Sequence, residues 1–180
     1  MKTIPKIGLG IALGFVILLV ISLVLMGMCV LSFKTAEEGP SKFLPLGQSA
    51  EVEGIKFTVV EYMLSKQMGD KSPSTEGAQY LFLHFNVENV GDVAKNPPYP
   101  HWNIEVTYKG EGVESGWVSM PVAINGRELD PYPFYGGDKI YPGVAKDGWE
   151  DYLVPIEFHL EDAKVVVTLD SEKVGWTLSK

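Results

Sequence analysis

The chain has 180 residues, a formal net charge of −8 and 46% hydrophobic residues. An acidic chain of this kind lacks the basic surface that attracts a phosphate backbone, so we expect no nucleic-acid partner. Cys29 is the single cysteine, which excludes an intramolecular disulfide and leaves a hydrophobic core as the main source of stability.

The first predicted element is the uncharged, apolar segment at residues 7–33. About 20 apolar residues span the hydrocarbon core of a bilayer as a helix, so this segment is predicted to be a transmembrane anchor. Two alternatives stay open. A cleaved signal peptide usually has a shorter apolar region, of about 7 to 15 residues. A lipid anchor at Cys29 generally requires a small residue before the cysteine, and Met28 stands there instead.

The charges that flank this segment predict its orientation. Lys2 and Lys6 precede the apolar residues, whereas acidic residues follow shortly after them. Basic flanks stay in the cytoplasm, which places residues 1–6 inside the cell. Residues 34–46 are rich in Glu, Gly, Pro and Ser and are predicted to be a linker to an extracytoplasmic domain at residues 47–180. We therefore expect a single-pass protein of the cell membrane.

Short β-strands separated by glycine and proline are predicted throughout the domain. The strongest lies at residues 80–90, where Leu81, Leu83, Phe85 and Val87 alternate with other residues and indicate one buried face. Further strands are predicted at residues 52–63, 103–108, 116–122, 151–160, 164–169 and 174–178. About seven short strands without helical periodicity predict an all-β fold, a two-sheet antiparallel sandwich. Because the Cys, Trp, Cys set of true Ig domains is missing, this pattern is Ig-like only in its architecture.

Two segments are predicted to be loops. Residues 69–77 form a polar stretch of turn-forming residues. Residues 125–143 contain three prolines, four glycines and four aromatic residues, and proline removes the donors that a central strand needs. A loop of this length is often functional.

Several short motifs in the domain resemble a known family. They are Asn89-Val90-Gly91 at the end of a long strand, the turn Tyr108-Lys109-Gly110, the step Tyr141-Pro142-Gly143, and a late strand through Pro155. Together they resemble the immunoprotective-extracellular-antigen-like domain of unknown function, over residues 47–179. The resemblance implies an Ig-like sandwich on an exported lipoprotein or membrane-anchored protein of bacteria or archaea. It implies no general activity and no catalytic residues.

Two sets of residues are candidate metal ligands. The three histidines are His84, His101 and His159. No His-x-His or equivalent ligand pair appears, and placement on the polar face of a strand explains His84 and His159 fully. Four carboxylates surround the Pro142-Gly143 turn, where hard oxygen ligands on a loop are suited to calcium. The alternative is a solvated acidic loop, because the spacing matches no EF-hand. These carboxylates are Asp138, Asp147, Glu150 and Asp151.

Six aromatic residues in or beside proline-rich loops are candidates for contact with a ligand or partner. Exposed rings can stack on a sugar or hold a peptide, and such anchors dominate many interfaces. The alternative is that the rings fold back and cap one end of the sandwich. They are Tyr99, Trp102, Tyr132, Phe134, Tyr135 and Tyr141. Trp117, Trp149 and Trp176 lie in or beside predicted strands and are expected in the core.

Motifs of nucleophilic hydrolysis and of phosphate binding are missing from the sequence. We therefore expect no enzyme and no catalytic residue. The expected function is that of a membrane-anchored extracytoplasmic module that binds an envelope protein, a peptide or a glycan. Two alternatives remain, a small-ligand or calcium-binding surface domain and a structural component of the envelope. Calcium is the one cofactor that the sequence suggests.

Overall fold

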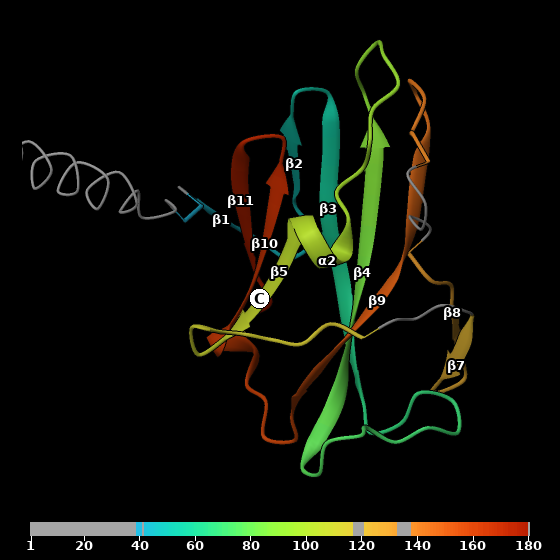
Figure 1. Ribbon diagram of the computed structural model, residues 1–180, viewed down its shortest axis with the longest axis vertical. Coiled ribbons are helices and arrows are strands. Elements are labelled where there is room, and N and C mark those ends of the chain that lie inside the picture. Colours follow the sequence, from blue (N-terminus) through green and yellow to red (C-terminus); the bar gives the residue numbers. More distant parts are fainter. Residues whose placement is uncertain (1–38, 41, 117–120, 133–137, 180) are drawn as a thin grey trace, which may run out of the picture. The chain divides into compact units, whose positions relative to one another are not determined.

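Two β-sheets and a separate hairpin form the described part of the chain (Figure 1). The structure is a computed structural model, and it describes residues 39–40, 42–116, 121–132 and 138–179. No helix among these residues is long and apolar enough to cross a membrane. The predicted anchor at residues 7–33 lies outside the described residues and stays a prediction.

The first sheet has the strand order β1-β11-β10-β5-β6, the second has the order β2-β3-β4-β9, and β7 pairs with β8. The strands are antiparallel to their neighbours except β1, which runs parallel to β11. The predicted all-β fold with antiparallel sheets is therefore confirmed. The elements are β1 (Phe43–Pro45), β2 (Ser49–Val52), β3 (Ile55–Ser65), β4 (Ala78–Asn89), α2 (Pro100–Asn103), β5 (Ile104–Tyr108), β6 (Glu111–Gly112), β7 (Val122–Ile124), β8 (Arg127–Leu129), β9 (Ala145–Pro155), the 3-10 helix η1 (Leu160–Asp162), β10 (Ala163–Leu169) and β11 (Glu172–Thr177).

The alternation predicted in the longest strand matches its two faces. In β4, Leu81, Leu83, Phe85 and Val87 are fully buried in the main core. The residues between them point to the opposite face of the sheet, since successive side chains of a strand alternate. That opposite face begins with aromatic residues and becomes polar toward Asn89, as the sequence predicts.

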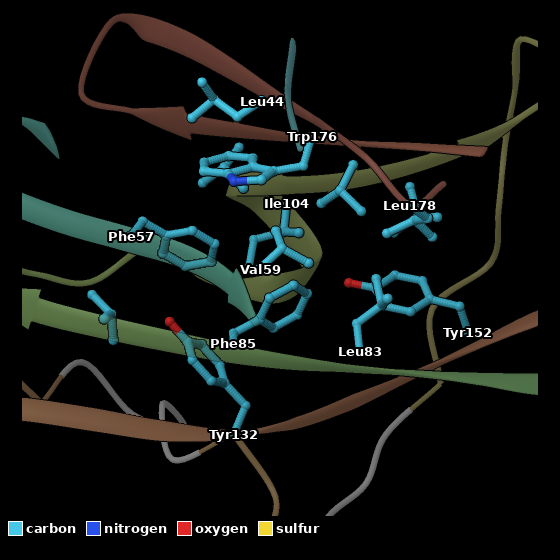
Figure 2. Packing of buried hydrophobic residues seen from close by; sticks show 14 of the residues in the cluster. Leu44, Phe57, Val59, Leu83, Phe85, Ile104, Tyr132, Tyr152, Trp176 and Leu178 are labelled. Carbon is cyan, nitrogen blue, oxygen red and sulfur yellow. The ribbon is translucent and has the colours of Figure 1, made fainter. Parts of the chain in front are cut away.

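The main core lies between the two sheets (Figure 2). Trp176 of β11 is fully buried, and its ring centroid lies 5.7 Å from that of Phe57 in the other sheet. Phe57 in turn packs 5.6 Å from Phe85. The indole N–H of Trp176 donates to the carbonyl oxygen of Gln48 at 2.7 Å. These contacts join the sheets, and aromatic groups of this size supply much of the buried apolar area.

A second core covers the outer face of the β3-β4-β9 sheet. The β7–β8 hairpin places Ile124 and Leu129 against Tyr80, Phe82 and Trp149, all of which are buried. The prediction of one loop over residues 125–143 is therefore wrong at β8. The physical reason is the Asn-Gly pair at positions 125 and 126, whose φ angles of 52° and 79° suit the tight turn of a two-residue hairpin.

Two other predicted strands have different bounds in the structure. The strand predicted at residues 52–63 is broken after Val52 by Glu53 and Gly54, whose φ angles of 47° and 79° turn the chain from β2 into β3. The strand predicted at residues 151–160 is β9, which begins and ends earlier because it pairs along the whole of β4. Most of the strand predicted at residues 116–122 lies outside the described residues, and Val122 begins β7.

The outer edge of β9 is covered by two short segments of backbone. Gly116 N–H donates to the carbonyl of Asp151, and Leu153 N–H donates to the carbonyl of Glu114. Further along the strand, Tyr132 N–H donates to the carbonyl of Trp149, and residues 131–132 come so close that a Cβ on Gly148 would lie 2.5 Å from Tyr132 Cα. A glycine at position 148 is therefore required for this covering.

Candidate functional site

Loops from both sheets meet at one end of the sandwich, which we call the loop end. It consists of the β2–β3 turn, the β10–β11 turn and the loops at residues 90–99 and 138–144, at the upper ends of the strands in Figure 1. The first of these segments is tied to the third, because the carbonyl of Gly54 accepts from the N–H groups of Val90 and Gly91. Loops on a rigid sandwich are common positions for binding sites.

Asn89 at the end of β4 holds two of these loops together. Its fully buried side-chain amide donates to the carbonyls of Val93 and Ile140 at 2.7 and 2.8 Å, and its oxygen accepts from Gly91 N–H at 3.0 Å. The backbone of Asn89 accepts from Gly143 N–H at 2.8 Å. The motifs at residues 89–91 and 141–143, far apart in the sequence, thus meet at one residue.

A cleft of about 490 Å³ opens at the loop end. Its buried apolar residues form the floor, and polar side chains form the rim. The floor consists of Val52, Ile55, Pro97, Pro98 and Leu169, and the rim contains Glu53, Lys95, Asn96, Tyr99, Asn103, Thr168 and Asp170. The volume lies within the range of about 300–1,000 Å³ that is usual for small-molecule sites.

The cation on the rim of this cleft is paired within the chain. The ammonium group of Lys95 donates to the carbonyl oxygen of Glu53 and lies 3.8 Å from the carboxylate of the same residue. The remaining charged group of the rim is the carboxylate of Asp170.

Two of the six predicted aromatic residues lie side by side at the cleft. Tyr99 is one of its lining residues, and the ring of Trp102 in α2 lies 5.5 Å away with 83% of the residue exposed. Tyr141 is also exposed, and Val90, Val93 and Val144 near it add apolar surface at the same end. Tyr132 is buried in the main core instead, as Figure 2 shows. Phe134 and Tyr135 lie outside the described residues.

The four predicted calcium ligands point in different directions. Asp138 and Asp147 are exposed, and Asp147 accepts from the His84 ring at 2.8 Å. Glu150 and Asp151 are buried and, as neighbours in β9, face opposite sides of the sheet. Across the described ranges, no group of three or more His, Cys, Asp or Glu side chains is placed to hold a metal ion. Calcium binding stays a prediction.

Glu150 is an acid in the interior of the sandwich. Burial, and then the charge of Asp151, raise its pKa to about 8. Its Oε1 lies 3.6 Å from Nε2 of His101, whose pKa burial lowers, and Nδ1 of His101 lies 2.6 Å from Ser115 Oγ. Burial also raises the pKa of Tyr152 well above its usual value. The pair of His101 and Glu150 could not be found from the sequence, because each lies on a different element.

The other two histidines, His84 and His159, lie away from Glu150 and in different surroundings. The ring of His84 stacks on Trp149 at 4.7 Å, with Nδ1 3.3 Å from Glu61 and Nε2 2.8 Å from Asp147. Arg127 of the hairpin lies over Trp149 and donates twice to Glu61, and these bonds are the main cause of the lowered pKa of Glu61. This cluster fixes the hairpin to the sheet. His159 is exposed and precedes η1.

The fold is similar to that of bacterial proteins of known structure. The yjhA protein from Bacillus subtilis matches with a TM-score of 0.50 and 16% identity, over 75% of this chain and 98% of that one. An uncharacterized beta-sandwich protein from Clostridium difficile 630 matches with a TM-score of 0.48 and 15% identity, over 79% of this chain and 98% of that one. No family model and no curated protein match the sequence. The similarity to the yjhA protein supports the β-sandwich fold and nothing about function.

Proposed function

We propose that this chain is a membrane-anchored, extracytoplasmic binding module whose loop end contacts a ligand or partner. The observation that carries the proposal is the cleft of about 490 Å³ beside Trp102, a large aromatic residue that is 83% exposed. A soluble domain normally buries such a ring, and exposed aromatic residues beside a cleft are frequent anchors of binding sites. The apolar segment at residues 7–33 supports the membrane anchor.

We also propose that the sandwich is Ig-like. Its connections support this assignment, because the chain passes from one sheet to the other between β4 and β5 and again between β9 and β10. In Ig domains strands B and E share one sheet, while C, F and G share the other. In chain order, β4, β5, β9, β10 and β11 take the places of strands B, C, E, F and G, with β4 and β9 in one sheet and the other three in the second.

Site-specific photo-crosslinking in cells tests the binding proposal. A photoreactive phenylalanine analogue replaces Trp102 in one variant and Tyr141 in another. Ile156 is the matched control position, since it is a large apolar residue that is 49% exposed and follows the far end of β9. We expect discrete adducts from the first two positions and none from the third. Adducts from position 156 alone, or equal background from all three, would contradict a role for the loop end.

A further inference from the structure

We propose that the cleft at the loop end binds a neutral glycan, with one sugar ring over its apolar floor. This inference rests on the proposed binding function and names the ligand class for the same site. A sugar ring is amphipathic, because its C–H groups form an apolar face and its hydroxyl groups project around its edge. A ligand that fits must match both the apolar floor and the polar rim of the cleft.

The floor and the rim of the cleft match these two parts of a sugar ring. Pro97, Pro98 and Leu169 are buried for most of their surface, and C–H groups can pack on the small apolar part of each that lines the cleft. Around them, the amide of Asn96 and the hydroxyl of Thr168 can both donate and accept hydrogen bonds, as sugar hydroxyls do. The oxygen of the Asn103 amide accepts from the N–H of Tyr99 at 2.9 Å, so this amide can offer its NH₂ group as a donor. A purely apolar ligand would leave this polar rim without partners, at a cost in free energy.

The neighbouring aromatic pair extends the apolar surface beyond the cleft. The rings of Tyr99 and Trp102 lie 5.5 Å apart, and their planes are tilted by 48° to each other. The two rings therefore offer a bound glycan two apolar faces at different angles. Trp102 is exposed, so its flat face can receive a second sugar ring without any rearrangement of the fold. Aromatic rings combine a large apolar face with little loss of conformational freedom on binding.

Charge favours a neutral ligand. Residues 35–180 carry 12 basic and 23 acidic residues, and the net negative charge of this segment disfavours polyanionic glycans. At the cleft itself, Lys95 is held by Glu53, which leaves the carboxylate of Asp170 to accept hydrogen bonds from hydroxyl groups. A carboxylate can accept from two donors at once, and sugars offer adjacent hydroxyl groups.

The backbone at this site favours a glycan over an extended peptide. A peptide that adds to a domain as a strand needs free backbone groups along an edge. In the β2–β3 turn, the carbonyl of Glu53 accepts from Lys95, and that of Gly54 accepts from Val90 and Gly91. These two carbonyl groups of the turn are therefore already bonded within the chain and are not available to an added strand.

Titration with neutral trisaccharides tests the inference. The full chain is purified in a detergent without a sugar headgroup, and maltotriose, mannotriose and the N-acetylglucosamine trimer are added separately. Binding is followed by saturation-transfer NMR and by isothermal titration calorimetry. We expect saturable binding of at least one of them. Trp102→Ala and Asp170→Asn should each weaken it about tenfold, while the matched control Ile156→Ala leaves it unchanged.

Two results would overturn the inference. One is that no trisaccharide binds at millimolar concentration, and the other is that Trp102→Ala and Asp170→Asn have no more effect than Ile156→Ala. Both variants change exposed side chains, so loss of folding does not explain a loss of binding. If the trisaccharides fail but a protein crosslinks at position 102, the binding function stands and its partner is a protein.

Discussion

Among single residues, Glu150 has the most unusual environment for its chemistry. A carboxyl group inside a sandwich cannot ionise at low cost, because the protein interior solvates a charge less well than bulk water does. The folded state therefore holds a proton on Glu150 up to a pKa of about 8, whereas its ordinary value is 4.5. Between these two pH values the unfolded state releases a proton that the folded state keeps.

This difference makes stability depend on pH. The free energy of unfolding should fall by about 1.4 kcal/mol for each pH unit between roughly pH 5 and 8, because the unfolded state binds fewer protons there. Glu150→Gln removes this contribution, so the variant should be the more stable protein at pH 8 and show a flatter pH profile. Chemical denaturation of both proteins between pH 6.5 and 8 measures the difference between their profiles.

The control for this prediction is Glu157→Gln, which changes an exposed carboxylate just after β9. It should have the same pH profile as the unchanged protein. Equal profiles for all three proteins would show that Glu150 ionises at an ordinary pKa.

Among the elements, the β7–β8 hairpin depends on tertiary contacts. An isolated two-stranded hairpin is marginally stable in water, so this one needs the second core beneath it. Leu129 is fully buried there. Leu129→Ala should destabilise the protein by about 3 kcal/mol, through lost burial and the cavity that remains.

Hydrogen exchange measures where that stability is lost. Amide protons of β7 and β8 should exchange much faster in Leu129→Ala than in the matched variant Glu128→Ala, whose exposed side chain lies on the same strand. If the hairpin keeps its protection while the main core loses it, then the hairpin is not held by this residue.

The long strands could be predicted from the sequence. The β7–β8 hairpin was not predicted, although the sequence contains a signal for it. Alternation along β4 identified both faces, because Leu81 to Val87 repeat with the period of a strand. Asn125-Gly126 between two short apolar segments is a strong hairpin signal, but the prolines that follow indicated a loop. Neither the cleft nor the contact of His101 with Glu150 has a local signature, since each is assembled from segments far apart in the chain.

At the scale of the whole molecule, the predicted topology separates the two ends of the chain by a membrane. Protease added to intact cells should remove an epitope tag at the carboxyl end and leave one at the amino end intact. The reason is that Lys2 and Lys6 favour a cytoplasmic amino end and residues 7–33 are long enough to span. Immunoblots of both tags provide the measurement.

The same blots distinguish the alternatives for the anchor. Both tags should be found on one full-length polypeptide before protease is added. Loss of the amino-terminal tag from the mature protein would instead identify a cleaved signal peptide or processing at Cys29.

The covering of the outer edge of β9 has a consequence for the predicted topology, in which copies of the domain share a membrane. Confinement to a surface raises the frequency of encounters, and an open edge strand would let one copy continue the sheet of the next. Residues 114–116 and 130–132 already occupy hydrogen-bonding positions along β9. The outer edge of this strand therefore offers a neighbouring molecule few free backbone groups to pair with. Crowding can therefore bring loop ends together without pairing between the β9 strands of neighbouring copies.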